Sequence, residues 1–240
     1  MLSGRILAIS DIHGCFDEFR NLMLKTGYQS EKDRLYLLGD YMDRGPNSKE
    51  VVYAVKDLVE NHGAIALRGN HDEFFLDWID DPVEGMHRMT INGGLDTLVS
   101  FLGEIDINAN DVKTWTSWRD RFVTEHEEVI TFMRGLHYYA EDDGYIFVHA
   151  GIDPELDNWK DTNKHDLVWI RRPFLDADLD MEETIIHGHT PNKDLHGKHD
   201  IFYRENKIGI DGGCAYGGQL NALEINTDGT RNEYVAQSKQ

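Results

Sequence analysis

Short apolar runs alternate with helical patterns along the first part of the chain. Three runs predict β-strands, because they are short, aliphatic and bounded by polar residues or glycine. They cover Arg5–Ser10, Leu35–Leu38 and Ala64–Leu67. Each ends at a polar segment, and the strand, segment and helix together have about the length of a βαβ unit. We therefore expect these polar segments at the carboxyl ends of strands, where α/β sheets bind ligands.

Two helices are expected between these strands. Gly27 is a suitable stop for the first helix, and Ser48 can cap the second. The apolar residues that recur near helical spacing are Phe16, Phe19, Met23 and Leu24 in the first helix and Val51, Val55, Leu58 and Val59 in the second.

The alternation of predicted strands and helices stops between residues 73 and 141, where the pattern indicates helices with irregular connections. No Pro/Gly/Ser-rich linker flanks this region. We therefore expect one domain, residues 1–240, with a mainly helical insertion at about 73–141 that covers one side of the site. Beyond it, further strands are expected, several of them antiparallel, at Tyr145–Val148, Thr184–Ile186, Ile201–Tyr203, Lys207–Ile210 and Ala222–Ile225.

The charge balance narrows the range of partners. The chain has 240 residues and a formal net charge of −20, which argues against duplex nucleic acid as the main partner. An anionic substrate would need local positive charge, which metal ions can supply. Two cysteines are too few for a secreted disulfide scaffold. The start shows no signal peptide and no apolar stretch reaches membrane-spanning length, so we expect a cytoplasmic protein without a membrane partner.

Candidate chemistry gathers in five segments that combine oxygen or imidazole ligands with glycine. They are Asp11–Gly14, Gly39–Gly45, Arg68–Asp72, His149–Gly151 and His187–Thr190. Any one alone would be an ordinary turn or cap. Their joint placement after strands indicates a two-metal hydrolytic site instead.

The residue types suit divalent transition metals. Asp11 and His13 are two apart, so at an extended strand end both would project to one side and reach one ion. Asp40 can bridge two ions through its two oxygens, and Asn70 offers a neutral oxygen. His149 and either His187 or His189 offer imidazoles. Manganese, iron or zinc fits this mixture better than calcium, and two such ions can activate a water and hold a phosphoryl group.

Groups that act on a phosphate ester lie beside these ligands. Arg44 and Arg68 flank the expected metals, and a guanidinium matches phosphate bidentately. His71 follows Asn70 and could protonate a leaving oxygen, with Asp43 orienting its imidazole.

The five motifs resemble those of the bacterial branch of the phosphoprotein phosphatase family of calcineurin-like metallophosphoesterases. The family pattern reads D-x-H-G, G-D-x-x-D-R-G, R-G-N-H-E, H-A/G-G and G-H-T, and Asp72 stands where Glu is usual. The resemblance extends from Leu7 to about Gly218. It implies an α/β fold, a β-sandwich of mixed sheets flanked by helices.

The resemblance also implies roles for individual residues. Asp43 and His71 would form an acid dyad, and Arg44 would contact phosphate. The segment Trp169–Arg171 resembles a W-x-R motif, which makes Arg171 a further phosphate contact, although Arg172 is adjacent. The family motif selects His189 over His187. The implied ligands are Asp11, His13 and Asp40 for one metal and Asp40, Asn70, His149 and His189 for the other.

The expected activity is metal-dependent hydrolysis of phosphoserine or phosphothreonine in a phosphoprotein or phosphopeptide, with two divalent ions. Manganese is the first choice of metal, and iron or zinc are alternatives. A second hypothesis keeps the site and takes a dinucleotide polyphosphate, as a bis(5'-nucleosyl)-tetraphosphatase does. Asp43 favours the protein substrate, because a serine alkoxide needs an acid more than a nucleotide does. A third hypothesis, a binding module on an inactive scaffold, conflicts with the complete ligand set.

Overall fold

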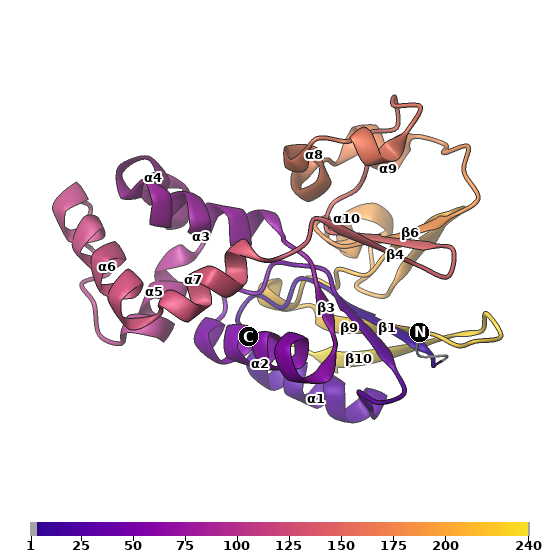
Figure 1. The fold of residues 1–240 in the computed structure, drawn as a ribbon, viewed down its shortest axis with the longest axis horizontal. Helices are drawn as coiled ribbons and strands as arrows, with labels where there is room; N and C mark the ends of the chain where they lie inside the picture. The colour runs from indigo at the N-terminus through magenta and orange to yellow at the C-terminus, as the bar shows by residue number, and fades with distance from the viewer. Residues whose placement is uncertain (1–3, 240) are drawn as a thin grey trace.

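Two mixed sheets form the centre of the computed structural model, which describes residues 4–239 (Figure 1). The first sheet has the order β10-β9-β1-β2-β3, with β1, β2 and β3 parallel and β9 antiparallel to both neighbours. Its strands are β1 (Ile6–Ile9), β2 (Arg34–Leu37), β3 (Ile65–Ala66), β9 (Gln219–Ile225) and β10 (Arg231–Gln237).

The second sheet has the order β4-β5-β6-β8-β7, with β5, β6 and β8 parallel inside two antiparallel edge strands. Its strands are β4 (Tyr139–Asp142), β5 (Tyr145–Val148), β6 (Thr184–His187), β7 (Phe202–Arg204) and β8 (Lys207–Gly209). One apolar cluster joins both sheets, and within it the rings of Tyr36 and Phe147 stack 3.9 Å apart. The expected sandwich of mixed sheets is confirmed.

Helices cover the outer faces of the sandwich. α1 (Phe16–Thr26) and α2 (Ser48–His62) lie along the first sheet, and α8 (Lys164–Trp169) and α9 (Arg172–Asp176) lie over the second (Figure 1). Gly27 ends α1 in the left-handed conformation, as predicted. The prediction for Ser48 is wrong: Asn47 is the cap residue of α2, and the Ser48 hydroxyl accepts a hydrogen bond from the Asp43 amide instead.

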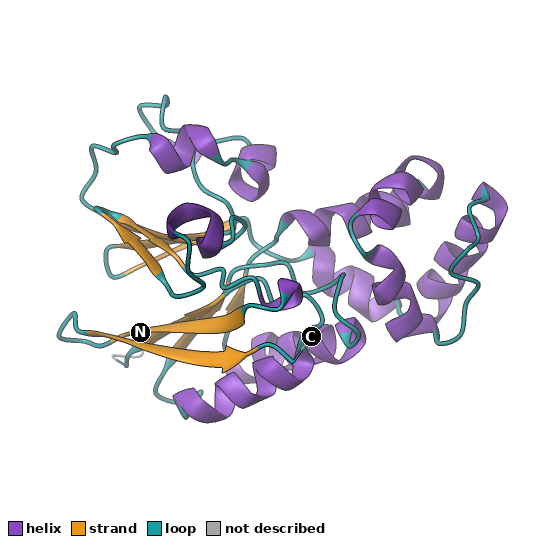
Figure 2. Cartoon of the chain, turned by 180° about the vertical axis from the view of Figure 1, so that it is seen from behind, coloured by secondary structure: helices purple, strands orange, loops and turns teal. Residues whose placement is uncertain are grey.

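A group of helices projects from one end of the sandwich (Figure 2). Its buried side chains include Trp78, Trp115 and Phe122, so these tryptophans are core residues. The group begins three residues before the expected insertion and ends before β4, whose first three residues fall within the expected range. Its members are α3 (Asn70–Asp80), α4 (Pro82–Ile91), α5 (Gly94–Leu102), α6 (Val112–Glu125) and α7 (Glu127–Arg134).

Short helical turns complete the connections. They are η1 (Trp159–Asp161), α10 (Asn192–His196) and η2 (Cys214–Tyr216). Within residues 4–239, none of the helices has the length and apolar character that a membrane crossing requires.

Candidate active site

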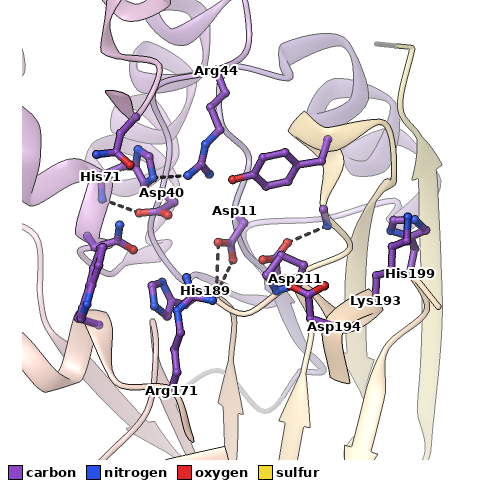
Figure 3. A pocket seen from close by; sticks show the side chains of 16 residues that line it. Asp11, Asp40, Arg44, His71, Arg171, His189, Lys193, Asp194, His199 and Asp211 are labelled. Carbon is purple, nitrogen blue, oxygen red and sulfur yellow. Dashed lines mark hydrogen bonds between the residues drawn. The ribbon is translucent and has the colours of Figure 1, made fainter. Parts of the chain in front are cut away.

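The carboxyl ends of strands from both sheets meet around one cavity of about 360 Å³ (Figure 3). Asp11 follows β1 and Asp40 follows β2 in the first sheet. His149 follows β5 and His189 follows β6 in the second sheet, while Asn70 begins α3. The sandwich therefore brings together residues that lie far apart in the sequence.

The loops at these strand ends are held in left-handed backbone conformations. Asp11, His13, Asp40 and His189 have φ values of 52°, 45°, 56° and 62°. The expected reason for Asp11 and His13 to share a side, an extended backbone, is therefore wrong. Non-glycine residues in this region cost about 1–3 kcal/mol each and gather at functional sites.

Backbone hydrogen bonds between neighbouring loops hold this geometry. The amide of His13 donates to the carbonyl of Asp40 at 2.9 Å, and the amide of Gly14 donates to the carbonyl of Tyr41 at 2.9 Å. Asp72 adds a third tie, because its carboxylate accepts from the amides of Gly69, Asp40 and Tyr41 at 2.7, 3.0 and 3.2 Å. The shorter Asp at this position thus connects the second and third motifs.

The side chains of the expected ligands converge on Asp40. Its Oδ2 lies 3.4 Å from Nε2 of His13 and 3.5 Å from Nε2 of His149. The Nε2 of His149 is also 3.1 Å from Oδ1 of Asn70. The Asp11 carboxylate accepts from the His189 amide at 3.1 and 3.2 Å. All six expected ligands therefore border one small space.

Carbonyl groups orient two of the imidazoles. The Nδ1 of His13 donates to the Met42 carbonyl at 2.7 Å, and the Nδ1 of His149 donates to the Leu38 carbonyl at 2.7 Å. Each ring therefore directs its Nε2 lone pair towards Asp40, an arrangement typical of metal-binding histidines.

The chemistry of this donor set fits divalent cations. Burial, together with repulsion from the Asp40 carboxylate, raises the pKa of Asp11 to about 6. Burial also raises the pKa of Asp40 to about 7. Burial also lowers the pKa of His149 and His189, and Nε2 of His189 has no hydrogen-bond partner within residues 4–239. A cation would stabilise the carboxylates and the neutral imidazoles together.

A buried dyad lies beside the ligands. The Nδ1 of His71 donates to Oδ2 of Asp43 at 2.7 Å, and Asp43 is fully buried. Thr97, which the sequence did not single out, donates to the other oxygen of Asp43 at 2.7 Å and accepts from its amide at 2.9 Å. Burial raises the pKa of Asp43 to about 7 and lowers that of His71, which Arg44 lowers further.

The structure separates the four candidate arginines. Arg44 and Arg171 line the cavity from opposite sides (Figure 3), and Arg44 donates to Nε2 of His13 at 2.5 Å and to Nε2 of His71 at 2.7 Å. Arg172 is largely exposed and pairs with Asp176 at 3.4 Å. Arg68 was expected to flank the metals. It instead donates to the Tyr138 hydroxyl at 2.9 Å and to the backbone carbonyls of Met133 and Arg134 at the end of α7.

His187 is buried outside the cavity lining. Its ring packs edge-on against Phe174 at 5.2 Å, and its Nδ1 donates to the Gly188 carbonyl at 3.1 Å. His189 therefore remains the candidate ligand from this motif.

Three residues on the far wall of the cavity, beside Tyr216, were not identified from the sequence: Asp211, Lys193 and His199. Asp211 is buried, accepts from the Gly213 amide at 2.8 Å, and has a pKa raised by burial and by Asp11. The signal was present, because Asp211 directly follows an apolar run, as Asp11 and Asp40 do.

Comparisons with known proteins identify the relatives of this chain. The family model described as calcineurin-like phosphoesterase matches residues 4–214. The chain is 30% identical to the asymmetrical bis(5'-nucleosyl)-tetraphosphatase PrpE of Anoxybacillus flavithermus, over 90% of this chain and 88% of the relative. It is 26% identical to the symmetrical bis(5'-nucleosyl)-tetraphosphatase of Nitrosococcus oceani, over 93% and 94%.

Two solved structures share the fold. One is described as a candidate diadenosine tetraphosphatase, with a TM-score of 0.69, 20% identity and coverage of 98% of this chain and 95% of that one. The other is a protein serine/threonine phosphatase from Saccharomyces cerevisiae, with a TM-score of 0.60, 17% identity and coverage of 100% and 82%.

Proposed function

Because the chain belongs to the calcineurin-like phosphoesterase family, we propose that it is a metal-dependent hydrolase of dinucleotide polyphosphates of the bis(5'-nucleosyl)-tetraphosphate class. The carrying observation is the gathering of six oxygen and imidazole donors beside Arg44 and Arg171. Four of them line the cavity, namely Asp11, Asp40, Asn70 and His189, and the Nε2 atoms of His13 and His149 lie 3.4 and 3.5 Å from Asp40. Relatives that match about nine-tenths of the chain are named for this substrate. These relatives favour the dinucleotide substrate, whereas Asp43 alone favoured the protein substrate.

The proposed metal ligands fall into two sets that share Asp40. Family members use a dimetal centre, and such ions supply Lewis-acid activation of water and of the phosphoryl group. The donor set suits manganese first, with iron or zinc as alternatives. One set is Asp11, His13 and Asp40, and the other is Asp40, Asn70, His149 and His189.

The chain's own residues hold the phosphoryl group and the proton. Arg44 and Arg171 enter the cavity from opposite walls, so each can donate to phosphoryl oxygens. A bound phosphoryl group neutralises Arg44, whose charge otherwise lowers the pKa of His71. The imidazole can then hold a proton on Nε2 for the leaving oxygen, while Asp43 fixes Nδ1.

A protein serine/threonine phosphatase is the second candidate, and the 2.7 Å contact between Asp43 and His71 favours it. A serine alkoxide is a poor leaving group and needs a strong proton donor. A nucleotide leaves as a stabilised phosphate anion and needs that donor less. The dyad therefore permits the protein substrate, although dinucleotide hydrolysis does not require it.

A substrate panel tests the proposal. The purified protein, with its metal content measured, should hydrolyse diadenosine tetraphosphate with a kcat/KM at least tenfold above that for a phosphoserine peptide. Identifying the nucleotide products would show which bond breaks, because symmetrical cleavage gives two diphosphates and asymmetrical cleavage gives a triphosphate and a monophosphate. A tenfold preference for the phosphopeptide would assign the second candidate instead.

A further inference from the structure

A second cavity, of about 410 Å³, adjoins the catalytic cavity. The two share three lining residues, Asn70, Asn92 and Trp169. The second cavity lies between α3, the end of α4, and α8, so its walls come from the helical group and from the helices over the second sheet. Its volume falls within the range of small-molecule sites.

Two asparagines and Trp169 lie at its border with the catalytic cavity, and its other walls include aromatic and aliphatic side chains. The rings of Phe74 and Trp169 lie 5.5 Å apart, and Trp169 is 40% exposed. Ile91, at the end of α4, is 66% exposed, while Val168 is buried. An exposed indole face beside apolar side chains is a surface on which a flat heterocycle can stack.

The charges around the cavity favour an uncharged group. Glu73 and Arg88 line it with opposite signs. Arg88 lies 5.0 Å above the Phe74 ring and pairs with Asp77 at 2.7 Å, so much of its charge is already matched. Phosphate groups would instead find Arg44 and Arg171 in the catalytic cavity.

We propose that this second cavity binds one nucleoside of the dinucleotide substrate, with its base against the ring of Trp169 and its polyphosphate directed into the catalytic cavity. The inference rests on the proposed function, since it assigns a place to one end of that substrate. The nucleoside is uncharged and heterocyclic, as the cavity requires, and three shared residues provide the continuity that one elongated molecule needs.

Ring contacts place this nucleoside on the side of the proposed acid. The ring of Phe74 lies 5.3 Å from that of His71, and the ring of Trp169 lies 5.5 Å from that of His189. The cavity thus adjoins His71 through Phe74 and the proposed ligand His189 through Trp169. Because it adjoins His71, we assign its nucleoside to the leaving nucleotide, whose oxygen His71 would protonate.

A binding experiment tests the subsite apart from turnover. Adenosine 5'-monophosphate should quench tryptophan fluorescence in the metal-loaded protein, and ribose 5-phosphate, which lacks the base, should not. The quenching should disappear in Trp169→Phe and persist in Trp159→Phe, a control at a half-buried tryptophan outside both cavities. Equal quenching by both ligands, or quenching that survives in Trp169→Phe, would overturn the subsite.

Kinetics provide a second, independent test. Ile91→Glu places a negative charge at the exposed edge of the cavity and should raise the KM for diadenosine tetraphosphate about 5- to 150-fold, the range that losing a stacked base produces. The control Val123→Glu changes an exposed aliphatic residue on α6. Relative to para-nitrophenyl phosphate, kcat/KM for the dinucleotide should fall only in Ile91→Glu.

The outcomes separate the two proposals. A wild-type protein that binds the monophosphate through Trp169 but does not hydrolyse the dinucleotide would support the nucleoside site and overturn the proposed substrate. Dinucleotide hydrolysis that Ile91→Glu leaves unchanged would support the substrate and overturn this site. Ile91-dependent turnover of a phosphopeptide with an apolar flanking residue, without monophosphate binding, would assign the cavity to a peptide side chain.

Discussion

At the residue scale, the dyad of Asp43 and His71 combines burial with a fixed tautomer. Thr97 and the backbone hold Asp43, which in turn fixes Nδ1 of His71. The Nε2 of His71 is the ring atom that faces Arg44 and the catalytic cavity. A proton can therefore pass to a leaving group from one atom only.

Replacing this imidazole should slow turnover without removing metal. His71→Asn should lower kcat about 10²- to 10⁴-fold, the usual contribution of acid–base catalysis. The metal content should stay the same, because His71 is not one of the proposed ligands. Single-turnover hydrolysis and elemental analysis would measure both quantities. His87→Asn, at an exposed histidine of α4, is the control. Near-normal turnover of His71→Asn would exclude the acid role.

The sequence indicated which residues form this site better than it indicated their backbone geometry. The motif residues point to the ligands because strand ends gather side chains from distant parts of the chain. The left-handed backbone at Asp11 and His13 has no such signal, since it depends on hydrogen bonds between loops. The support from Thr97 was missed because its partner Asp43 lies on a different element, 54 residues away.

At the element scale, the loop after β6 passes very close to the loop after β1. A Cβ placed on Gly188 would come within 2.0 Å of the Ser10 hydroxyl oxygen and 2.1 Å of Oδ2 of Asp11. Real Cβ atoms do not approach this closely, so only glycine lets these two loops meet. The position of His189 relative to Asp11 depends on that contact.

Gly188→Ala should therefore separate the loops and weaken metal binding. We expect at least a tenfold loss in manganese affinity, in line with the roughly 10- to 100-fold cost of disturbing supporting contacts at metal sites. Isothermal titration calorimetry of the metal-free protein would measure it. Gly135→Ala, where the added Cβ would lie 3.3 Å from its nearest neighbour, is the matched control. Unchanged affinity in Gly188→Ala would show that the loops can move apart freely.

Strand prediction found the buried strands and the edge strands β3 and β7, and it missed the edge strands β4 and β10. The buried β1, β2 and β5 appear as apolar runs. β4 and β10 were missed because both are rich in polar residues, and because β4 is mostly half-buried and β10 mostly exposed. Apolar periodicity reflects the burial of side chains. An edge strand is defined by backbone pairing, which does not require apolar side chains.

At the scale of the whole molecule, buried carboxylates make the stability of the metal-free protein depend on pH. Burial raises the folded-state pKa of Asp11 to about 6 and those of Asp40 and Asp43 to about 7, from an ordinary value of 3.8. A raised pKa means that the folded state favours the protonated form. This contribution to stability is present below about pH 4 and is lost as pH rises through 6 to 7.

Buried histidines with lowered pKa values, such as His13 and His149, contribute in the opposite sense, but only below their ordinary pKa of 6.5. The metal-free protein should therefore lose stability between about pH 6.5 and pH 8, at about 2–4 °C in Tm for each kcal/mol. Manganese should oppose this loss, because it binds the deprotonated carboxylates. Thermal unfolding with chelator or with metal, across this pH range, would measure both effects. Asp43→Asn should flatten the metal-free profile, whereas the exposed Asp157→Asn should not. A metal-free Tm that rises towards pH 8 would contradict the expected sign.

The pairing of β1 with β9 has a consequence for how the protein is made. β1 leaves the ribosome long before its antiparallel partner, which spans Gln219–Ile225. Until that segment emerges, one edge of β1 stays open to pairing with other chains, a known route to aggregation. Nascent chains stalled before Gln219 should accordingly recruit chaperones, and the first sheet can close only after Ile225 has left the ribosome.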